Sequence, residues 1–182
     1  MKSYYIGLYF DKIYMQRTSF SMRMENYRER PWVRPREDKW SFGETYYHLY
    51  LMVKRFRQLN NFYLPVAKQI ASRRRKASYK TEIEDIYKEY KQKKKKPMKA
   101  PSILVPPKDI ESTISFATLT RELDEETKRL EQLVSAIEDD VAGHIRYPDP
   151  VAHHPNLIQA IQLIAIHEQH HFQLCAFYYD LP

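Results

Sequence analysis

Apolar residues recur at intervals of three and four along four long stretches of the chain. This spacing places them on one face of a helix, so it predicts four amphipathic helices that share a core. Proline-rich or strongly charged segments separate the four stretches, which is typical of loops. The predicted helices cover about residues 4–27, 41–65, 109–141 and 155–179.

The start of the second helix is the most sharply defined boundary. Residues 41–44 read Ser-Phe-Gly-Glu, which is the capping-box pattern: Ser41 caps the first turn while Glu44 reaches back to the Ser41 amide. Proline removes an amide donor and crowds the preceding turn, so we expect Pro65 to bend or end this helix. The fourth helix is expected to begin near Pro155 or Asn156, because proline is tolerated in a first turn.

The connection between the second and third helices is long and unusual. We expect a short helix around Lys80–Lys91, followed by an extended stretch over Lys93–Pro107, which contains four prolines. No segment has a convincing strand pattern, and the whole chain has three glycines. The sequence therefore predicts an all-α four-helix bundle, one domain over residues 1–182, with a basic, partly helical insertion at 73–108.

The insertion also carries the excess positive charge. Residues 73–99 contain twelve Lys/Arg and four Asp/Glu, a net +8 in a chain of net charge +7. Such charge runs are usually solvated connections, and binding to an anionic partner is the alternative. No zinc finger, RNA-recognition signature or Gly-rich phosphate loop accompanies the charge, so no specific nucleic acid is expected.

The sequence also predicts the cellular location of the protein and the chemical state of its cysteine. No run of about 18 uncharged apolar residues forms a membrane span, and Asp11 and Lys12 interrupt the N-terminal stretch where a signal peptide would be apolar. We therefore expect a cytoplasmic protein with no membrane span. The single cysteine, Cys175, falls in an apolar helical context that predicts an inert buried thiol.

Three histidines lie where the helical pattern calls for apolar residues. His167 and His171 are four residues apart on the inward stripe of the fourth helix, so both rings can point at one ion. His48 has the same kind of position on the stripe of the second helix. A buried imidazole without a partner costs free energy, and one divalent cation would satisfy all three. A carbonyl or water bound to each ring is the alternative.

The predicted ligand set indicates a particular kind of metal site. Three protein ligands with an open fourth position are typical of catalytic zinc, where the pKa of bound water falls towards about 7. Imidazole ligands suit zinc or nickel best, with iron or manganese as alternatives. The cofactor expected from His48, His167 and His171 is therefore a divalent metal ion.

Residues His167–His171 also match the H-E-x-x-H signature, in which Glu168 would act as the general base of a metalloprotease. The extended form of that signature needs Gly and His where Leu174 and Phe177 stand. Glu168 also points about 100° away from His167 around the helix. We rank the protease interpretation below the others, and Glu168 is a weak candidate base.

The combined motifs resemble the DinB-like, or YfiT-like, metal-binding four-helix bundles. The resemblance implies a divalent ion held by His48, His167 and His171, and it implies metal-dependent hydrolases or transferases that use thiols such as bacillithiol, mycothiol or glutathione. Many relatives have Gln where this chain has Leu174. The residues that carry the resemblance are Lys39-Trp40-Ser41, Glu44, His48-Leu49, His154-Pro155, His167 and His171.

Three classes of function follow as hypotheses. The first is a metal-dependent hydrolase or low-molecular-weight-thiol S-transferase that acts on a small-molecule substrate, with a homodimer as the expected assembly. The second is a catalytically silent helical-bundle scaffold, and the third is a protein that binds an anionic partner through its basic segment.

Overall fold

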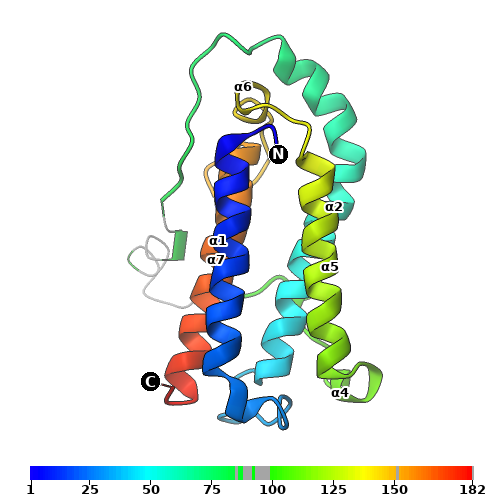
Figure 1. Ribbon diagram of the computed structural model, residues 1–182, viewed down its shortest axis with the longest axis vertical. Coiled ribbons are helices and arrows are strands. Elements are labelled where there is room, and N and C mark those ends of the chain that lie inside the picture. The colour runs from blue at the N-terminus through cyan, green and yellow to red at the C-terminus, as the bar shows by residue number, and fades with distance from the viewer. Residues whose placement is uncertain (85, 88–91, 93–98, 151, 182) are drawn as a thin grey trace.

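The computed structural model describes residues 1–84, 86, 87, 92, 99–150 and 152–181, and these are mainly helical (Figure 1). No strand is present among them, apart from one isolated bridge between Arg146 and Asn156. The prediction of an all-α bundle is therefore confirmed. The four long helices are α1 (Tyr4–Arg23), α2 (Phe42–Ser72), α5 (Phe116–Val134) and α7 (Leu157–Tyr178), and the short elements are η1 (Glu25–Tyr27), η2 (Ser102–Leu104), α4 (Ile110–Thr113) and α6 (Asp139–Ala142).

The four long helices pack as two pairs. Helix α1 lies against α7 and α2 lies against α5, and the core fills the space between the pairs. Figure 1 shows that the two members of each pair run in the same direction, because the long connection after α2 returns the chain to the end of the bundle where α2 began. The beginning of α2 and the end of α7 consequently lie at the same end of the molecule.

Each long helix begins at a polar residue whose side chain accepts from a backbone amide of the first turn. Ser41 accepts from the amide of Glu44 while Glu44 accepts from the amide of Ser41, which confirms the predicted capping box. Asn156 and Gln159 form the same reciprocal pair at the start of α7. These caps satisfy amides that no helical carbonyl can reach, so they fix where α2 and α7 begin.

The sequence alone left open whether Pro65 bends or ends the second helix, and in the structure α2 does not end there. It continues to Ser72, and its upper part changes direction in Figure 1. The carbonyl that loses its donor belongs to Asn61, four residues earlier, and both Asn61 and Pro65 are exposed. Water can therefore pair with that carbonyl, and the helix tolerates the proline at the cost of a bend.

The single helix predicted over 109–141 is wrong, because this stretch forms α4, α5 and α6. Ile114 is extended, and Ser115 then caps α5 by accepting from the amide of Thr118. Glu138 is extended before α6. Val134, Ile137 and Val141 keep helical spacing across the second break, so the apolar pattern could not reveal it, whereas nine positions separate the buried residues Ile110 and Leu119 across the first break.

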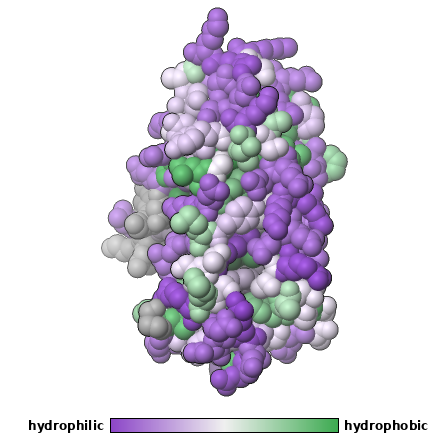
Figure 2. All heavy atoms as spheres, viewed as in Figure 1, coloured by the Kyte–Doolittle hydropathy of each residue, from purple (hydrophilic) through white to green (hydrophobic). Residues whose placement is uncertain are grey.

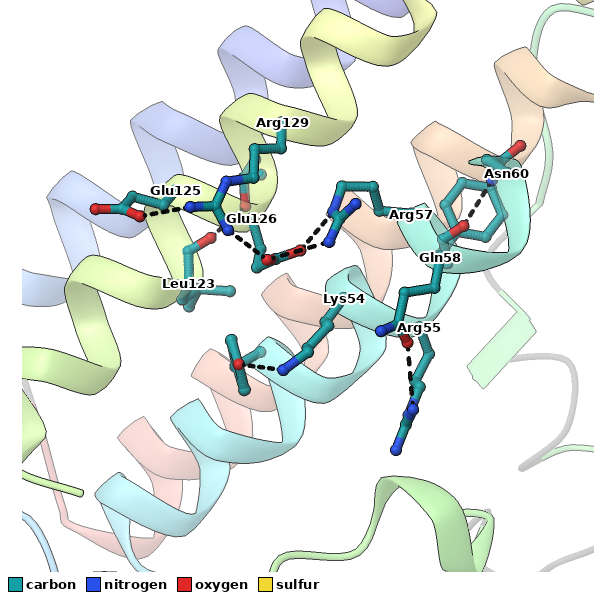
Figure 3. Close-up of polar contacts among 12 residues, drawn as sticks. Lys54, Arg55, Arg57, Gln58, Asn60, Leu123, Glu125, Glu126 and Arg129 are labelled. Carbon is teal, nitrogen blue, oxygen red and sulfur yellow. Dashed lines mark hydrogen bonds and ion pairs between the residues drawn. The ribbon is translucent and has the colours of Figure 1, made fainter. Parts of the chain in front are cut away.

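Ion pairs between charged side chains also connect α2 to α5. Figure 3 shows Arg57 of α2 and Arg129 of α5 both directed at the carboxylate of Glu126. The Arg57 Nε atom lies 2.6 Å from the Glu126 carboxylate, and Glu126 is buried. A buried carboxylate is tolerated only with such partners, so this triad holds the two helices in one register.

The start of the insertion runs along α7 rather than into solvent. Asn156 donates to the carbonyl of Lys80, Gln159 to that of Glu82, and the Gln162 side chain accepts from the amide of Ile83. Residues 80–84 are therefore not helical, and the prediction of helix in this part of 80–91 is wrong because side-chain amides of α7 and its cap replace helical partners, whereas Ile86 and Tyr87 are helical as predicted. Residues 88–91 of that predicted helix and the Lys93–Lys96 run lie outside the described residues.

The face shown in Figure 2 is mainly hydrophilic, with apolar side chains interspersed over it. Several of the exposed apolar residues lie on α1, including Leu8, Met15 and Met22. Among the helices that the structure describes, none combines the length and apolar character needed to cross a bilayer.

Candidate metal centre

The three predicted histidines converge at the end of the bundle where α2 begins and α7 ends. His48 lies in the second turn of α2 and is fully buried, and His167 and His171 lie one turn apart on α7 and are partly buried. One nitrogen from each ring falls within 4.8 Å of the others. The capping box of α2 sets the position of His48, because the cap fixes where the helical register begins.

The three rings surround a common point. Ring centroids are 4.9 Å apart for His48 and His167 and 4.6 Å apart for the two pairs that include His171. The Nε2 atoms of His48 and His167 face each other at 2.9 Å. Two ring nitrogens at this distance need either a proton or a cation between them, because two lone pairs would repel.

The ring nitrogens that point away from the cluster have oxygen partners. His48 Nδ1 lies 2.7 Å from the carbonyl oxygen of Leu104, which only accepts, so His48 carries a proton on Nδ1. A neutral His48 then presents a lone pair on Nε2, toward the cluster. The Nδ1 atom of His167 is hydrogen-bonded to the hydroxyl of Tyr87. Both contacts come from the insertion: Tyr87 precedes the undescribed stretch, and Leu104 follows it.

Burial keeps the cluster neutral. Desolvation lowers the pKa of His48, and it lowers those of His167 and His171 well below the usual value for histidine. Repulsion between the neighbouring rings lowers the pKa values of the two α7 histidines further. Neutral imidazoles have the lone pairs that a metal cation requires, so the three rings could bind a cation at neutral pH.

Aromatic rings enclose the cluster. Trp40, in the loop before α2, has its ring centroid 4.9 Å from that of His48, and it stacks on His171 at 6.1 Å with an interplanar angle of 15°. Tyr87 stacks on His170 at 4.1 Å with an interplanar angle of 6°. These rings limit the access of water to the histidines and support their orientation.

Glu168, the candidate base, lies on a different side of α7. Its side chain is fully buried and accepts from Arg17 Nε at 2.9 Å and Nη2 at 2.8 Å. Burial raises the pKa of Glu168, while the Arg17 guanidinium opposes that rise. Arg17 also donates to Asp124 of α5 and to Thr127. Glu168 therefore links α7 to α1 and α5 and forms none of its hydrogen bonds with the histidines.

Other residues singled out from the sequence lie away from the cluster or are chemically quiet. His153 and His154 have left-handed φ angles of 56° and 55° in the turn before α7. Cys175 is buried with its Sγ 3.6 Å from the Thr45 hydroxyl, and burial raises the pKa of its thiol to about 11. The thiol is therefore protonated at neutral pH, as an inert cysteine should be.

Sequence reasoning missed three groups that contact the cluster or its helix. Tyr87 and the Leu104 carbonyl reach the histidines from a segment that reads as charged and proline-rich, and Arg17 pairs with a glutamate 151 positions away. Trp40 was part of a recognisable motif but had no assigned contact. Only its position next to Ser41, at the start of the same helix as His48, could have suggested its place.

The residues fit a divalent cation by the chemistry of the donor set. Three neutral imidazoles bring ring nitrogens within 4.8 Å of one another, and the outward nitrogen of His48 is held by an acceptor. That arrangement of a ligand nitrogen and an outer acceptor is typical of histidines in metal sites. Two helices therefore bring the three rings together, with His48 from α2 and His167 and His171 from α7.

Fold and site together define a helical bundle with a histidine cluster shared between its second and last long helices. The sequence model of the DinB superfamily matches residues 13–175, so the chain belongs to the DinB superfamily. Comparisons with curated proteins and with solved structures each found no match. The matched region includes all three histidines.

Proposed function

We propose that this DinB-superfamily protein is a metal-dependent enzyme in which His48, His167 and His171 hold a divalent cation, with zinc or nickel preferred. The observation that carries the proposal is the convergence of three imidazoles, one buried and two partly buried, whose pKa values are lowered. Three neutral histidine ligands leave a coordination position open for a reactant, as catalytic sites do.

A low-molecular-weight thiol is the nucleophile that the surroundings favour, and water in a hydrolysis is the second candidate. The groups that contact the three rings are other imidazoles, an indole, a phenol and a backbone carbonyl. These groups are weak bases, so the cation must account for most of the lowering of the pKa of the bound thiol or water. A bound divalent cation lowers the pKa of a neighbouring thiol or water, and a thiol, with its ordinary pKa of about 8.5, needs the smaller shift.

The chain's own residues then have defined tasks. His48 stays aimed at the cluster because Leu104 holds its Nδ1 proton. Trp40 covers one side of His171 and keeps bulk water from that face. The substrate is expected to be a small electrophile that reaches the cluster beside these rings, since a thiolate transfers to an electrophilic carbon or sulfur centre.

Metal binding is tested first. Purified protein is stripped with a chelator and titrated with zinc and with nickel, and Trp40 fluorescence is followed, because Trp40 is in contact with two of the three rings. We expect one ion per chain for the wild type and at least a tenfold weaker affinity for His48→Ala. His144→Ala is the matched control, since His144 Nε2 donates to the Ala77 carbonyl, away from the cluster. Equal affinity for wild type and His48→Ala would refute the ligand assignment.

The reaction class is tested separately. The metal-loaded protein is incubated with a small electrophile such as chlorodinitrobenzene and with bacillithiol, mycothiol or glutathione in turn, and thioether formation is measured. We expect product to form with a thiol and to disappear after chelation. Product formation that persists without metal would refute the transferase mechanism, and ester or amide cleavage without any thiol would favour the hydrolase.

A further inference from the structure

The insertion contributes to the histidine cluster from both of its described parts. Before the undescribed stretch, Tyr87 contacts His167, and after it, Leu104 contacts His48. Residues 80–83 are held along α7 by three side-chain amides of that helix, and the Tyr9 hydroxyl of α1 donates to the Thr81 carbonyl at 3.0 Å. Several independent hydrogen bonds of residues 80–83 therefore help to position Tyr87 beside His167.

In the absence of a cation, the hydrogen bonds of the cluster allow one order of donors and acceptors. His48 donates from Nδ1 to Leu104, so its Nε2 accepts. His167 must then donate from Nε2 to His48, across the 2.9 Å that separates the two atoms. His167 Nδ1 is left with a lone pair, and the Tyr87 hydroxyl donates to it. A single chain of hydrogen bonds runs from Tyr87 through both imidazoles to Leu104.

A cation in the cluster requires the opposite arrangement at His167. Its Nε2 must then offer a lone pair, so the ring proton moves to Nδ1, and Nδ1 becomes a donor. A hydroxyl group can donate in the first state and accept in the second, whereas a carbonyl can only accept. Tyr87 therefore suits a ring that changes its tautomer, and the Leu104 carbonyl suits His48, whose tautomer is the same in both states.

We propose that Tyr87 is a positioning residue that orients His167 in both tautomers and so sets the metal affinity of the cluster. The stacking of Tyr87 on His170, with ring centroids 4.1 Å apart, limits rotation of the phenol ring beside His167. The inference rests on the proposed metal site and adds to it a residue from the insertion. An outer partner of this kind typically changes metal affinity by 10–100-fold.

The first experiment compares zinc affinities of the full-length wild type, Tyr87→Phe and Tyr79→Phe by competition with a chromophoric chelator. Tyr79 is the matched control because it belongs to the same insertion and its ring contacts His144 rather than the cluster. We expect wild-type affinity for Tyr79→Phe and an affinity about 10–100-fold weaker for Tyr87→Phe. Tyr87→Phe that binds zinc as tightly as the wild type overturns the inference. A wild type that binds no metal refutes the proposed function instead.

The second experiment uses the wild type alone and does not depend on how the variant folds. Long-range proton–nitrogen NMR spectra report which ring nitrogen carries the proton. We expect His167 to be protonated on Nε2 in the metal-free protein and on Nδ1 after zinc is added, with His48 protonated on Nδ1 throughout. A proton on His167 Nδ1 in both states overturns the inference, because Tyr87 would then have a single role that any acceptor could fill.

Discussion

Replacement of Glu168 by alanine should destabilise the protein strongly, although this residue belongs to a motif that suggests catalysis. The substitution leaves the Arg17 side chain, 8% exposed, without its two bonds to a carboxylate that is 1% exposed. Removal of one partner of a buried ion pair typically costs about 3–5 kcal/mol. Arg17 keeps Asp124 and Thr127, so we expect the lower end, about 3 kcal/mol.

That loss is measurable in a chain of this length. For a protein of this size, about 3 kcal/mol corresponds to a fall of roughly 6–12 °C in Tm. Urea unfolding followed by circular dichroism gives the free energy of unfolding directly, and Glu168→Gln should fall between the wild type and Glu168→Ala because it keeps one acceptor. Glu125→Ala is the control: this residue is 42% exposed and pairs with Arg129 on the helix surface, so its loss should cost less than about 1 kcal/mol. A Glu168→Ala variant within about 1 kcal/mol of the wild type would refute the structural role.

Three further predictions follow. Because the pKa values of the three histidines of the cluster are lowered in the folded state, the unfolded chain binds more protons below about pH 6.5, so the Tm of the metal-free protein should fall from about pH 7.5 to 5.5; a flat profile would contradict neutral buried rings. Cys175, with its pKa raised to about 11, should react with iodoacetamide far more slowly in the folded than in the urea-unfolded protein, as mass spectrometry will show, and equal rates would contradict its burial. Pro65→Ala should restore an amide donor within α2 and raise the free energy of unfolding by about 1–3 kcal/mol in urea titrations, and destabilisation would mean that the bend itself is needed.

The parts of the fold that depend on local sequence could be predicted. The capping box at Ser41 and the four-residue spacing of His167 and His171 involve neighbours on one helix, so the start of α2 and the shared face followed from the printed residues. His48 was placed on an inward stripe by the same periodicity. That the stripes of α2 and α7 meet at one end could be expected only from the fold class.

The parts of the fold and of the site that depend on distant partners could not be predicted from the sequence. Nothing near Arg17 indicates that its partner is Glu168, and the pairing became visible only when α1 and α7 were side by side. The break between α5 and α6 preserves the apolar spacing, so a periodicity argument could not detect it. Tyr87 lies in a run of charges, and its role depends on side-chain amides of α7 that attach residues 80–83 beside it.

The attachment of the insertion at Tyr87 and Leu104 divides its sequence into parts under different constraints. Tyr87 gives His167 its outer oxygen partner through a side chain, whereas Leu104 gives His48 its partner through the backbone, which a substitution at position 104 leaves in place. If the cluster holds the proposed cation, exchanging a segment that includes Tyr87 would therefore alter metal affinity, even though no ligand is moved.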